Sequence, residues 1–275
     1  MSGEPRPGRA PAPIVLLTDF GLADWYVAAM KGVLLGLAPG APLVDLTHAI
    51  PPGDARRAAF VLAQAWPWFP AETVFVAVVD PGVGGARRAL AARAAARSFV
   101  GPDNGVLTPA LEQPGAEAVA IDPARLAADP PSATFHGRDL FAPAAARLAV
   151  GATLASLGAA VADAVRLAPE RPFARGGALV AHVVYVDRFG DCVTDVTRAD
   201  LAAYLAGRAA AGLRVRAGRA AIAGLARTYA DAPEGAALAL LGSGGRLEIA
   251  VRGGHAGARL GLGPGDPVEL SWAEG

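Results

Sequence analysis

The chain has 275 residues, with 25 Lys plus Arg against 25 Asp plus Glu and a single cysteine. Zero formal charge argues against a nucleic-acid-binding protein, because phosphate binding is driven by clustered positive charge. One cysteine, Cys192, cannot form an intramolecular disulfide, which excludes a secreted disulfide scaffold. No apolar run reaches the roughly 18 residues of a membrane span, and the polar, proline-rich start lacks a signal-peptide core. We therefore expect a cytoplasmic protein that binds neither nucleic acid nor membrane.

The composition is strongly biased toward alanine and arginine. The chain holds 66 alanines and 24 arginines but one lysine, Lys31. This bias is most simply that of a GC-rich bacterial genome. It raises the apparent hydrophobicity and obscures helix signals, because alanine suits almost any element.

Strand and helix patterns alternate in the first half of the chain. Alternation of this kind predicts an α/β domain over residues 14–166, with a mostly parallel sheet and helices on both of its faces. Residues 1–13 are expected to form a flexible tail. The expected strands are 14–18, 43–46, 73–79 and 98–101, and the expected helices are 24–37 and 54–66.

The pattern changes at residues 167–177, a stretch rich in Pro, Gly and Arg that we interpret as a linker. Short strands separated by glycines then predict a β-barrel-like domain over residues 178–275. Its expected strands are 179–186, 193–196, 213–215, 238–241, 247–251 and 268–272, with one helix near 200–205.

Polar or glycine-rich turns follow four of the expected strands. Ligands of an open α/β sheet bind beyond the carboxyl ends of its strands, so these turns indicate a site. Asp80 ends an apolar strand, so its carboxylate needs a partner, and Arg87 lies seven residues further on, across a glycine-rich loop. His136 is the only histidine in a polar turn that is directly followed by glycine. The four turns are Thr18–Gly21, Leu46–His48, Asp80–Gly85 and Gly101–Gly105.

Each of these signals also has a simpler interpretation. Asp80 is equally explained as the cap of a common Asp-Pro-Gly turn, Arg87 beside Arg88 as a solvated pair, and a lone histidine as a structural residue. His48 fits either a pocket or a turn. The sequence contains only fragments of the kinase metal motif and of the P-loop, so neither motif is present. The histidines and Cys192 do not have the spacing of zinc ligands, so no metal site is expected.

Taken in order, the motifs resemble those of the S-adenosyl-L-methionine (SAM) hydroxide adenosyltransferases, also called SAM hydrolases, which are relatives of the fluorinase and chlorinase. The resemblance runs from about Ile14 to the C-terminus. It is carried by TDFG with Asp24, DPGVG with Arg87, PDNG, FHGRD, Asp187-Arg188-Phe189-Gly190, and Ser243 with Leu247-Glu248-Ile249-Ala250.

The resemblance implies a homotrimer in which each active site lies between the N-terminal domain of one subunit and the C-terminal domain of its neighbour. It implies hydrolysis of SAM to adenosine and L-methionine, with SAM as substrate and no cofactor. Asp80, Arg87 and His136 would be catalytic, holding a water or hydroxide for attack on the 5′ carbon. The halogenating relatives lack these charged residues and this histidine, which favours water over halide. The alternatives are a halogenase of the same fold and a non-catalytic SAM- or adenosine-binding sensor.

The resemblance also implies a set of substrate-binding residues. Asp19 would hold the ribose hydroxyls, and Phe189 would pack on the adenine. Asp24, Asp187 and Ser243 would contact the methionine end. Asn104 and Glu248 lie in two of the matching motifs and would also bind the substrate. Asp191 departs from the family pattern, which has Asn there, and a carboxylate only accepts hydrogen bonds whereas an amide also donates.

Overall fold

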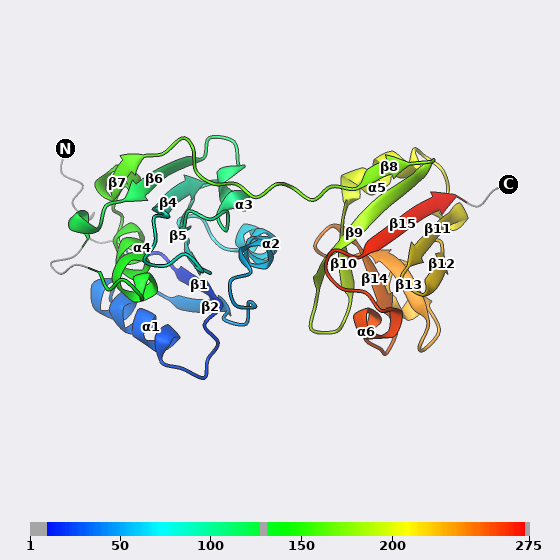
Figure 1. The fold of residues 1–275 in the computed structure, drawn as a ribbon, viewed down its shortest axis with the longest axis horizontal. Coiled ribbons are helices and arrows are strands. Elements are labelled where there is room, and N and C mark those ends of the chain that lie inside the picture. Colours follow the sequence, from blue (N-terminus) through cyan, green and yellow to red (C-terminus); the bar gives the residue numbers. More distant parts are fainter. Residues whose placement is uncertain (1–9, 127–130, 273–275) are drawn as a thin grey trace. The chain divides into compact units, whose positions relative to one another are not determined.

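The computed structural model describes residues 10–126 and 131–272 (Figure 1). The chain divides into two compact units, Met1–Leu167 and Ala168–Gly275. The first is an α/β unit and the second is rich in strands, which confirms the predicted fold class. The bounds expected from the sequence, 14–166, 167–177 and 178–275, stay predictions. In the part of the chain that the structure describes, no helix has the length and apolar character that a membrane crossing requires.

The end of the predicted N-terminal tail is hydrogen-bonded to the first unit. Residues 1–9 lie outside the described residues. Ala12 N–H donates to the carbonyl of Ala149 over 2.8 Å, and the carbonyl of Pro13 accepts from Val74 N–H over 2.9 Å. Residues 12 and 13 therefore belong to the first unit.

The first unit alternates strands and helices for most of its length. Its strands are β1 (Ile14–Thr18), β2 (Leu43–Thr47), β3 (Val74–Val78), β4 (Ala89–Ala94), β5 (Arg97–Pro102), β6 (Glu117–Ile121) and β7 (Gly158–Ala160). Its α-helices are α1 (Tyr26–Leu37), α2 (Ala55–Ala65), α3 (Thr108–Leu111) and α4 (Ala142–Ala149). Short helical turns are η1 (Trp66–Trp68), η2 (Pro123–Arg125), the π-helical η3 (Gly137–Phe141) and η4 (Leu154–Ser156).

The seven strands form one mixed sheet in the order β2-β1-β3-β5-β4-β6-β7. The neighbours among β2, β1, β3 and β5 pair in parallel, and the remaining pairs are antiparallel. The four parallel strands are those expected from the sequence. The antiparallel half was not predicted, because β4 is built mainly from alanine and carries no strand pattern.

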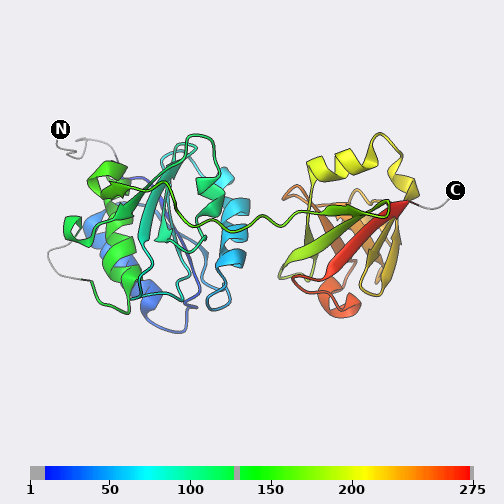
Figure 2. The same ribbon diagram turned by 45° about the horizontal axis from the view of Figure 1, so that its top comes forward.

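Helices cover both faces of this sheet, as Figure 2 shows for α1 and α4 on one side and α2 on the other. Successive side chains of a strand point to opposite faces, so β1 contributes Leu16 to one core with Met30 and Leu34 of α1, and Leu17 to another with Leu62 of α2. Phe75 on β3 lies in the second core. A strand buried on both faces must be apolar throughout, which explains the continuous runs of β1 and β3.

The second unit is built mainly from strands, which are β8 (Phe173–Arg175), β9 (Ala178–Val186), β10 (Cys192–Thr197), β11 (Leu213–Ala217), β12 (Ala220–Ala223), β13 (Ala237–Leu241), β14 (Arg246–Val251) and β15 (Pro267–Trp272). They form an antiparallel, nearly closed barrel-like sheet in the order β12-β11-β15-β9-β10-β14-β13, with β8 paired to β9. A bridge between Ala226, in the segment that follows β12, and Leu240 on β13 adds a further contact. The helices are α5 (Arg198–Leu205) and α6 (Ala256–Leu260), with short turns η5 (Ala210–Gly212) and η6 (Tyr229–Asp231).

The stretch 167–177, expected to be a linker, is partly structured. Leu167 N–H donates to Thr108 Oγ1 over 2.9 Å, which fastens its start to the first unit. Its later part holds β8, which pairs with β9 in the second unit. The start of this stretch is thereby attached to the first unit, and its later part is attached to the second.

Candidate functional site

Asp80 and Arg87 form a paired group directly beyond the end of β3. The Asp80 side chain is only 5% exposed and that of Arg87 12%. Arg87 Nε donates to Asp80 Oδ1 over 2.9 Å, and Arg87 Nη2 donates to Asp80 Oδ2. Two parallel hydrogen bonds from one guanidinium fix the carboxylate in position and direction. Asp80 therefore has the partner that its burial requires.

The glycine-rich loop between these two residues is folded back tightly. Val83 N–H donates to the Asp80 carbonyl over 3.2 Å. Gly84 has a φ of +76°, and a Cβ there would collide with the carbonyl oxygen of Ala133. Only glycine allows this close approach. The loop thereby packs against the segment that leads into His136.

His136 is joined to the pair through Arg87. Arg87 Nη2 lies 2.7 Å from His136 Nδ1. A guanidinium only donates, so Nδ1 accepts and the hydrogen of the neutral ring lies on Nε2. Burial lowers the pKa of His136, and the charge of Arg87 lowers it further. The structure thus brings Asp80, Arg87 and His136 together around one guanidinium, which we call the Arg87 cluster.

Arg88 has a separate set of partners. Its Nε donates to Asp103 Oδ2 and its Nη1 to Asp163 Oδ1, both over 2.7 Å. Asp103 Oδ1 accepts from Val165 N–H over 2.7 Å. The interpretation of Arg87 and Arg88 as a solvated pair is therefore wrong, because each side chain is held by carboxylates.

The other polar residues predicted in the first unit lie on loops beyond strand ends. Asp19 directly follows β1, and its Oδ2 accepts from Gly53 N–H over 2.8 Å. Asp24 is exposed in the bend before α1. Asn104 Nδ2 donates to the carbonyl of Val79 over 2.8 Å, so its amide supports the residue that precedes Asp80. In the described residues, no hydrogen bond or ion pair joins Asp19 or Asp24 to the Arg87 cluster.

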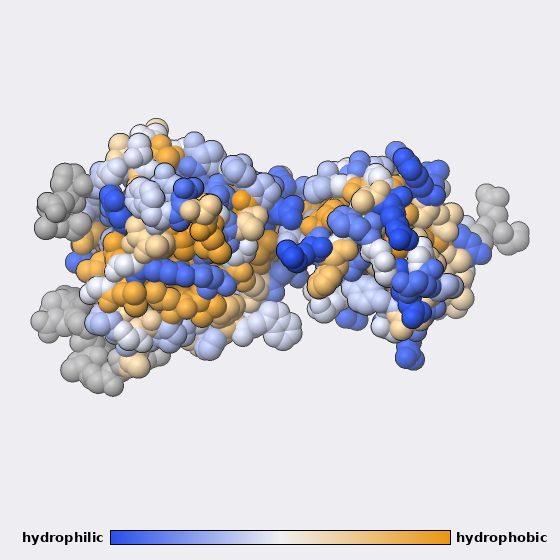
Figure 3. Space-filling model, turned by 90° about the horizontal axis from the view of Figure 1, so that it is seen from below, coloured by the Kyte–Doolittle hydropathy of each residue, from blue (hydrophilic) through white to orange (hydrophobic). Residues whose placement is uncertain are grey.

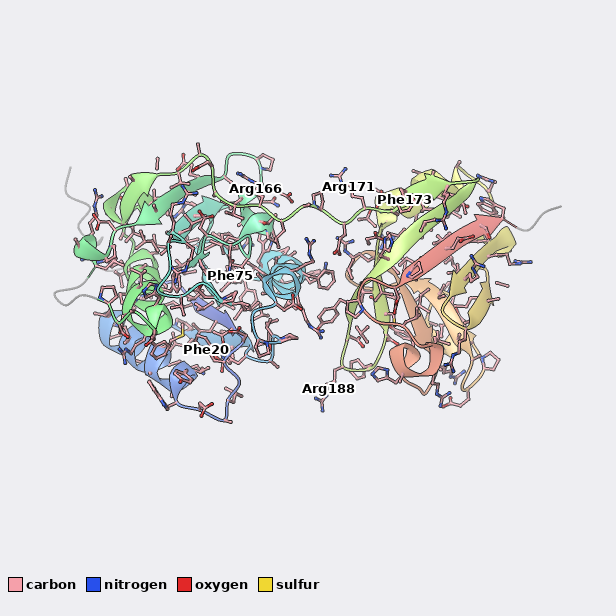
Figure 4. The ribbon with its side chains drawn as sticks, in the orientation of Figure 1. Phe20, Phe75, Arg166, Arg171, Phe173 and Arg188 are labelled. Carbon is pink, nitrogen blue, oxygen red and sulfur yellow. The ribbon has the colours of Figure 1, made fainter. Side chains whose placement is uncertain are left out.

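The predicted residues of the second unit gather around the loop between β9 and β10. Asp187 Oδ1 accepts from the N–H groups of Phe189 and Asp191, each over 2.9 Å. The Phe189 side chain remains 78% exposed. A Cβ at Gly190, whose φ is +91°, would collide with the ring of His255. This loop also carries Arg188, which Figure 4 shows extending from the unit.

Three carboxylates of this unit, Asp187, Asp191 and Glu248, interact electrostatically, and we call them the acidic cluster. Burial raises the pKa of Asp191, and the charge of Asp187 raises it further. Burial also raises the pKa of Glu248, whose Oε2 accepts from the Tyr229 hydroxyl over 3.2 Å. The carboxylate of Glu248 lies against Gly242, next to the exposed Ser243. Such a group of carboxylates favours a cationic ligand.

Cys192 does not contribute a reactive thiolate to this region. It is buried, and burial with the neighbouring carboxylates raises its pKa to about 11. A nucleophilic thiol needs a lowered pKa, so the interpretation of Cys192 as a packing residue fits. Among residues 10–126 and 131–272, no group of three His, Cys, Asp or Glu is arranged to hold a metal ion.

The sequence reasoning missed two polar residues of these regions. Tyr229 lies 19 positions before Glu248, its hydrogen-bond partner. Asp163 lies 75 positions after Arg88. No local motif marks either residue, so only their contacts identify them.

Comparison with known proteins places these motifs in a family. The family model for the SAM hydroxide adenosyltransferase N-terminal domain matches residues 14–158, and the model for the C-terminal domain matches residues 181–269. A protein of Thermotoga maritima, described as an uncharacterized conserved protein, has the same fold with a TM-score of 0.87 at 36% identity, over 94% of this chain and 99% of its own.

Curated relatives agree with the family models. The (R)-S-adenosyl-L-methionine hydrolase of Salinispora arenicola is 47% identical over 94% of this chain and 97% of its own length. That of Thermus thermophilus is 44% identical over 94% and 99%. A fluorinase of an Actinoplanes species is 31% identical over 68% and 72%. The chain belongs to the SAM hydroxide adenosyltransferase family.

Proposed function

We propose that this protein hydrolyses SAM to adenosine and L-methionine. The observation that carries the proposal is the Arg87 cluster, in which a buried carboxylate, a guanidinium and a neutral imidazole are hydrogen-bonded together in a member of this family. Relatives at 44–47% identity over nearly their whole length carry the same activity in their names.

The reaction needs a held nucleophile more than an activated leaving group. The sulfonium of SAM already leaves as a neutral thioether, so the protein must hold one oxygen in line with the C5′–S bond. The new C5′–O bond forms as the C5′–S bond breaks, sulfur keeps the electron pair, and the one proton that the water loses is released to solvent. Asp80, Arg87 and His136 carry this role.

The tautomer of His136 favours one form of this step. With Nδ1 accepting from Arg87, the ring presents Nε2–H as a donor. A donor of this kind stabilises an oxygen that carries negative charge. The arrangement therefore supports a hydroxide held by His136, with Asp80 keeping Arg87 in place.

The remaining predicted residues bind the substrate in this proposal. Asp19 holds the ribose hydroxyls through Oδ1, since Gly53 occupies Oδ2. The acidic cluster receives the cationic methionine end, because SAM carries both a sulfonium and an ammonium group. Phe189 packs on the adenine. The remaining substrate contacts come from Asp24, Asn104 and Ser243.

A halogenase of the same fold is the alternative closest in chemistry. Fluorinase relatives match at lower identity and over less of the chain. Both oxygens of the buried Asp80 carboxylate accept from Arg87, so the charge of the guanidinium is already neutralised and offers little attraction to a halide. A non-catalytic sensor has no use for the Arg87 cluster. Both alternatives are therefore disfavoured.

We also infer a homotrimer, with active sites between subunits, that works in the cytoplasm of a bacterium. Figure 3 shows broad apolar areas on the N-terminal unit. The exposed apolar residues of that unit include Leu22, Trp25, Leu35, Leu37 and Val44, and large patches of this kind are typical of protein contacts. Light scattering coupled to size-exclusion chromatography tests the assembly, with a trimer expected and a monomer contradicting it.

The function is tested by incubating the purified protein with SAM and separating the products. The relatives are named for the (R) sulfonium epimer, so both epimers are assayed separately, with and without chloride. We expect equal amounts of adenosine and methionine from the (R) epimer, without any need for chloride. Intact SAM after long incubation with both epimers, or a chlorinated nucleoside, would overturn the proposal.

A further inference from the structure

A chain of polar contacts runs through the first unit from its surface to the end of β1. Lys31 Nζ on α1 lies 2.6 Å from Asp45 Oδ2 on β2. Asp45 Oδ1 lies 3.0 Å from His48 Nε2. His48 Nδ1 lies 2.8 Å from Thr18 Oγ1. We call these four residues the His48 network. None of them belongs to the residues proposed above for binding or catalysis.

The contacts assign a direction to each hydrogen bond. Thr18 is fully buried, and its Oγ1 accepts from Phe20 N–H over 3.2 Å. Asp45 Oδ1 lies 3.0 Å from His48 Nε2 and can only accept, so the hydrogen of the neutral ring is assigned to Nε2, and Nδ1 then accepts from the Thr18 hydroxyl. Lys31 donates to the other oxygen of Asp45.

This network leads to the loop that carries Asp19. Gly21 N–H donates to the carbonyl of His48 over 2.8 Å. Phe20, labelled in Figure 4, lies with its ring centroid 5.9 Å from that of Tyr26. The residues on both sides of Asp19 are therefore attached, directly or through Thr18, to His48. Within the described part of the chain, the Asp19 side chain is held by the hydrogen bond that it accepts from Gly53 N–H.

The one lysine of the chain fits this arrangement better than an arginine. Lys31 stands in a sequence with 24 arginines. A guanidinium in its place would bind both oxygens of Asp45 as a fork. The compact ammonium takes Oδ2 and leaves Oδ1 to His48. The residue type at position 31 thus leaves an anionic oxygen beside His48 Nε2.

We propose that His48 is a positioning residue, which holds the 18–21 loop so that Asp19 Oδ1 is aimed at the ribose hydroxyls of the substrate, while Lys31 and Asp45 set its tautomer. The part that concerns the ribose rests on the proposed function. The part that concerns the loop and the tautomer does not.

Two conservative variants separate the two sides of the imidazole. In His48→Asn the amide oxygen stands near the place of Nδ1 and still accepts from Thr18, whereas in His48→Gln the longer amide reaches toward Asp45 instead. We expect His48→Gln to raise KM for SAM about tenfold or more with kcat little changed, and His48→Asn to raise it much less. Lys31→Met, at a partly exposed position, should raise KM less than His48→Gln. The matched control is His182→Gln, in the second unit, with KM unchanged.

Spectroscopy supplies the readout that needs no turnover. Nitrogen NMR of the wild-type protein should show His48 with its hydrogen on Nε2, and Lys31→Met should shift that signal. Hydrogen exchange at the Gly21 amide should be faster in His48→Gln, at an unchanged melting temperature of the unit. A hydrogen on Nδ1, or unchanged exchange in His48→Gln, overturns the positioning role.

The two failures are distinguishable. If the wild-type protein hydrolyses SAM but His48→Gln and His48→Asn have equal KM values, the inference is wrong and the function stands. If the wild-type protein neither hydrolyses SAM nor binds adenosine, the proposed function and the ribose role fail together. The tautomer and the Gly21 exchange then still decide whether His48 positions the loop.

Discussion

The Arg87 cluster and the acidic cluster handle buried charge in opposite ways. In the first unit, Asp80 is paired on both oxygens, and the same guanidinium reaches His136. In the second unit, burial raises the pKa values of Asp191 and Glu248, and the hydroxyl of Tyr229 is a neutral partner. The first cluster is electrostatically complete without a ligand, whereas the second gains most from a bound cation.

This difference suggests different duties for the two regions. A site that orders a reacting oxygen benefits from groups fixed before the substrate arrives, because no reorganisation is then needed during the reaction. A site that selects a cationic substrate benefits from carboxylates that the substrate itself neutralises. Substitutions in the Arg87 cluster should therefore act on kcat, and those in the second unit on KM.

Replacing Arg87 by Met should have the largest effect. It leaves the Asp80 carboxylate buried without its cation and removes the donor to His136. We expect kcat to fall about 10³-fold, with a lower melting temperature because an unpaired buried charge is costly. Arg88→Met is the matched control, since it also leaves a buried carboxylate, Asp103, without its cation. An equal loss of kcat in both variants would mean that only stability is affected.

His136→Ala should lower kcat about 10²-fold and change KM little, because His136 acts on the attacking oxygen in this account. Asp80→Ala should show the same division between kcat and KM. Comparable losses in binding and in rate would instead make these two residues substrate-holding groups. Steady-state kinetics at neutral pH distinguish the two outcomes.

The pH profile gives a separate test of His136. Burial and Arg87 lower its pKa from the ordinary value of 6.5, so the neutral ring persists as the pH falls through that value. We expect kcat/KM to decline only at more acidic pH. The unfolded chain takes up a proton near pH 6.5 that the folded chain does not, so the free energy of unfolding should also decrease as the pH falls through that value. A decline of kcat/KM that is already centred at or above pH 6.5 would contradict a lowered pKa for His136.

Phe189→Ala should raise KM about fivefold, the lower end of what stacking a base on an aromatic ring contributes. The side chain is 78% exposed, so the melting temperature should not change. Trp68→Ala, at an aromatic residue that is 83% exposed in the other unit, is the matched control. A changed kcat with constant KM would place Phe189 outside the adenine contact.

Asp191→Asn should have the smallest effect on activity, leaving kcat intact and KM equal or lower, because the amide keeps an acceptor and adds a donor while Asp187 and Glu248 keep the negative charge that the cationic substrate meets. The pKa of Asp191 in the folded chain is raised above the ordinary 3.8. The folded chain therefore holds this proton more tightly than the unfolded chain, and the free energy of unfolding decreases as the pH rises from 3.8 through the raised pKa. The variant should therefore melt at a higher temperature than the wild type, more so at pH 7 than at pH 4. Asp163→Asn, where Arg88 lowers the pKa, should not show that gain. Loss of activity in Asp191→Asn would contradict this account.

The sequence predicted the parallel strands and the polar turns at their ends because apolar runs and turn residues are local signals. It did not predict β4, whose alanines have no strand preference and are held by pairing with β5 and β6. The contact of Arg87 with His136, 49 positions away, was expected only from the family resemblance. The sequence does not decide the role of His48, because its partners on β1 and β2 come beside it only when the strands pair.

The central claim is that the Arg87 cluster directs a water oxygen to the 5′ carbon of SAM. The most direct measurement is mass spectrometry of the nucleoside formed from SAM in ¹⁸O-labelled water with chloride present. We predict adenosine that carries one labelled oxygen, formed together with methionine, and almost none in Arg87→Met. Unlabelled adenosine, a chlorinated nucleoside or unchanged SAM would contradict the claim.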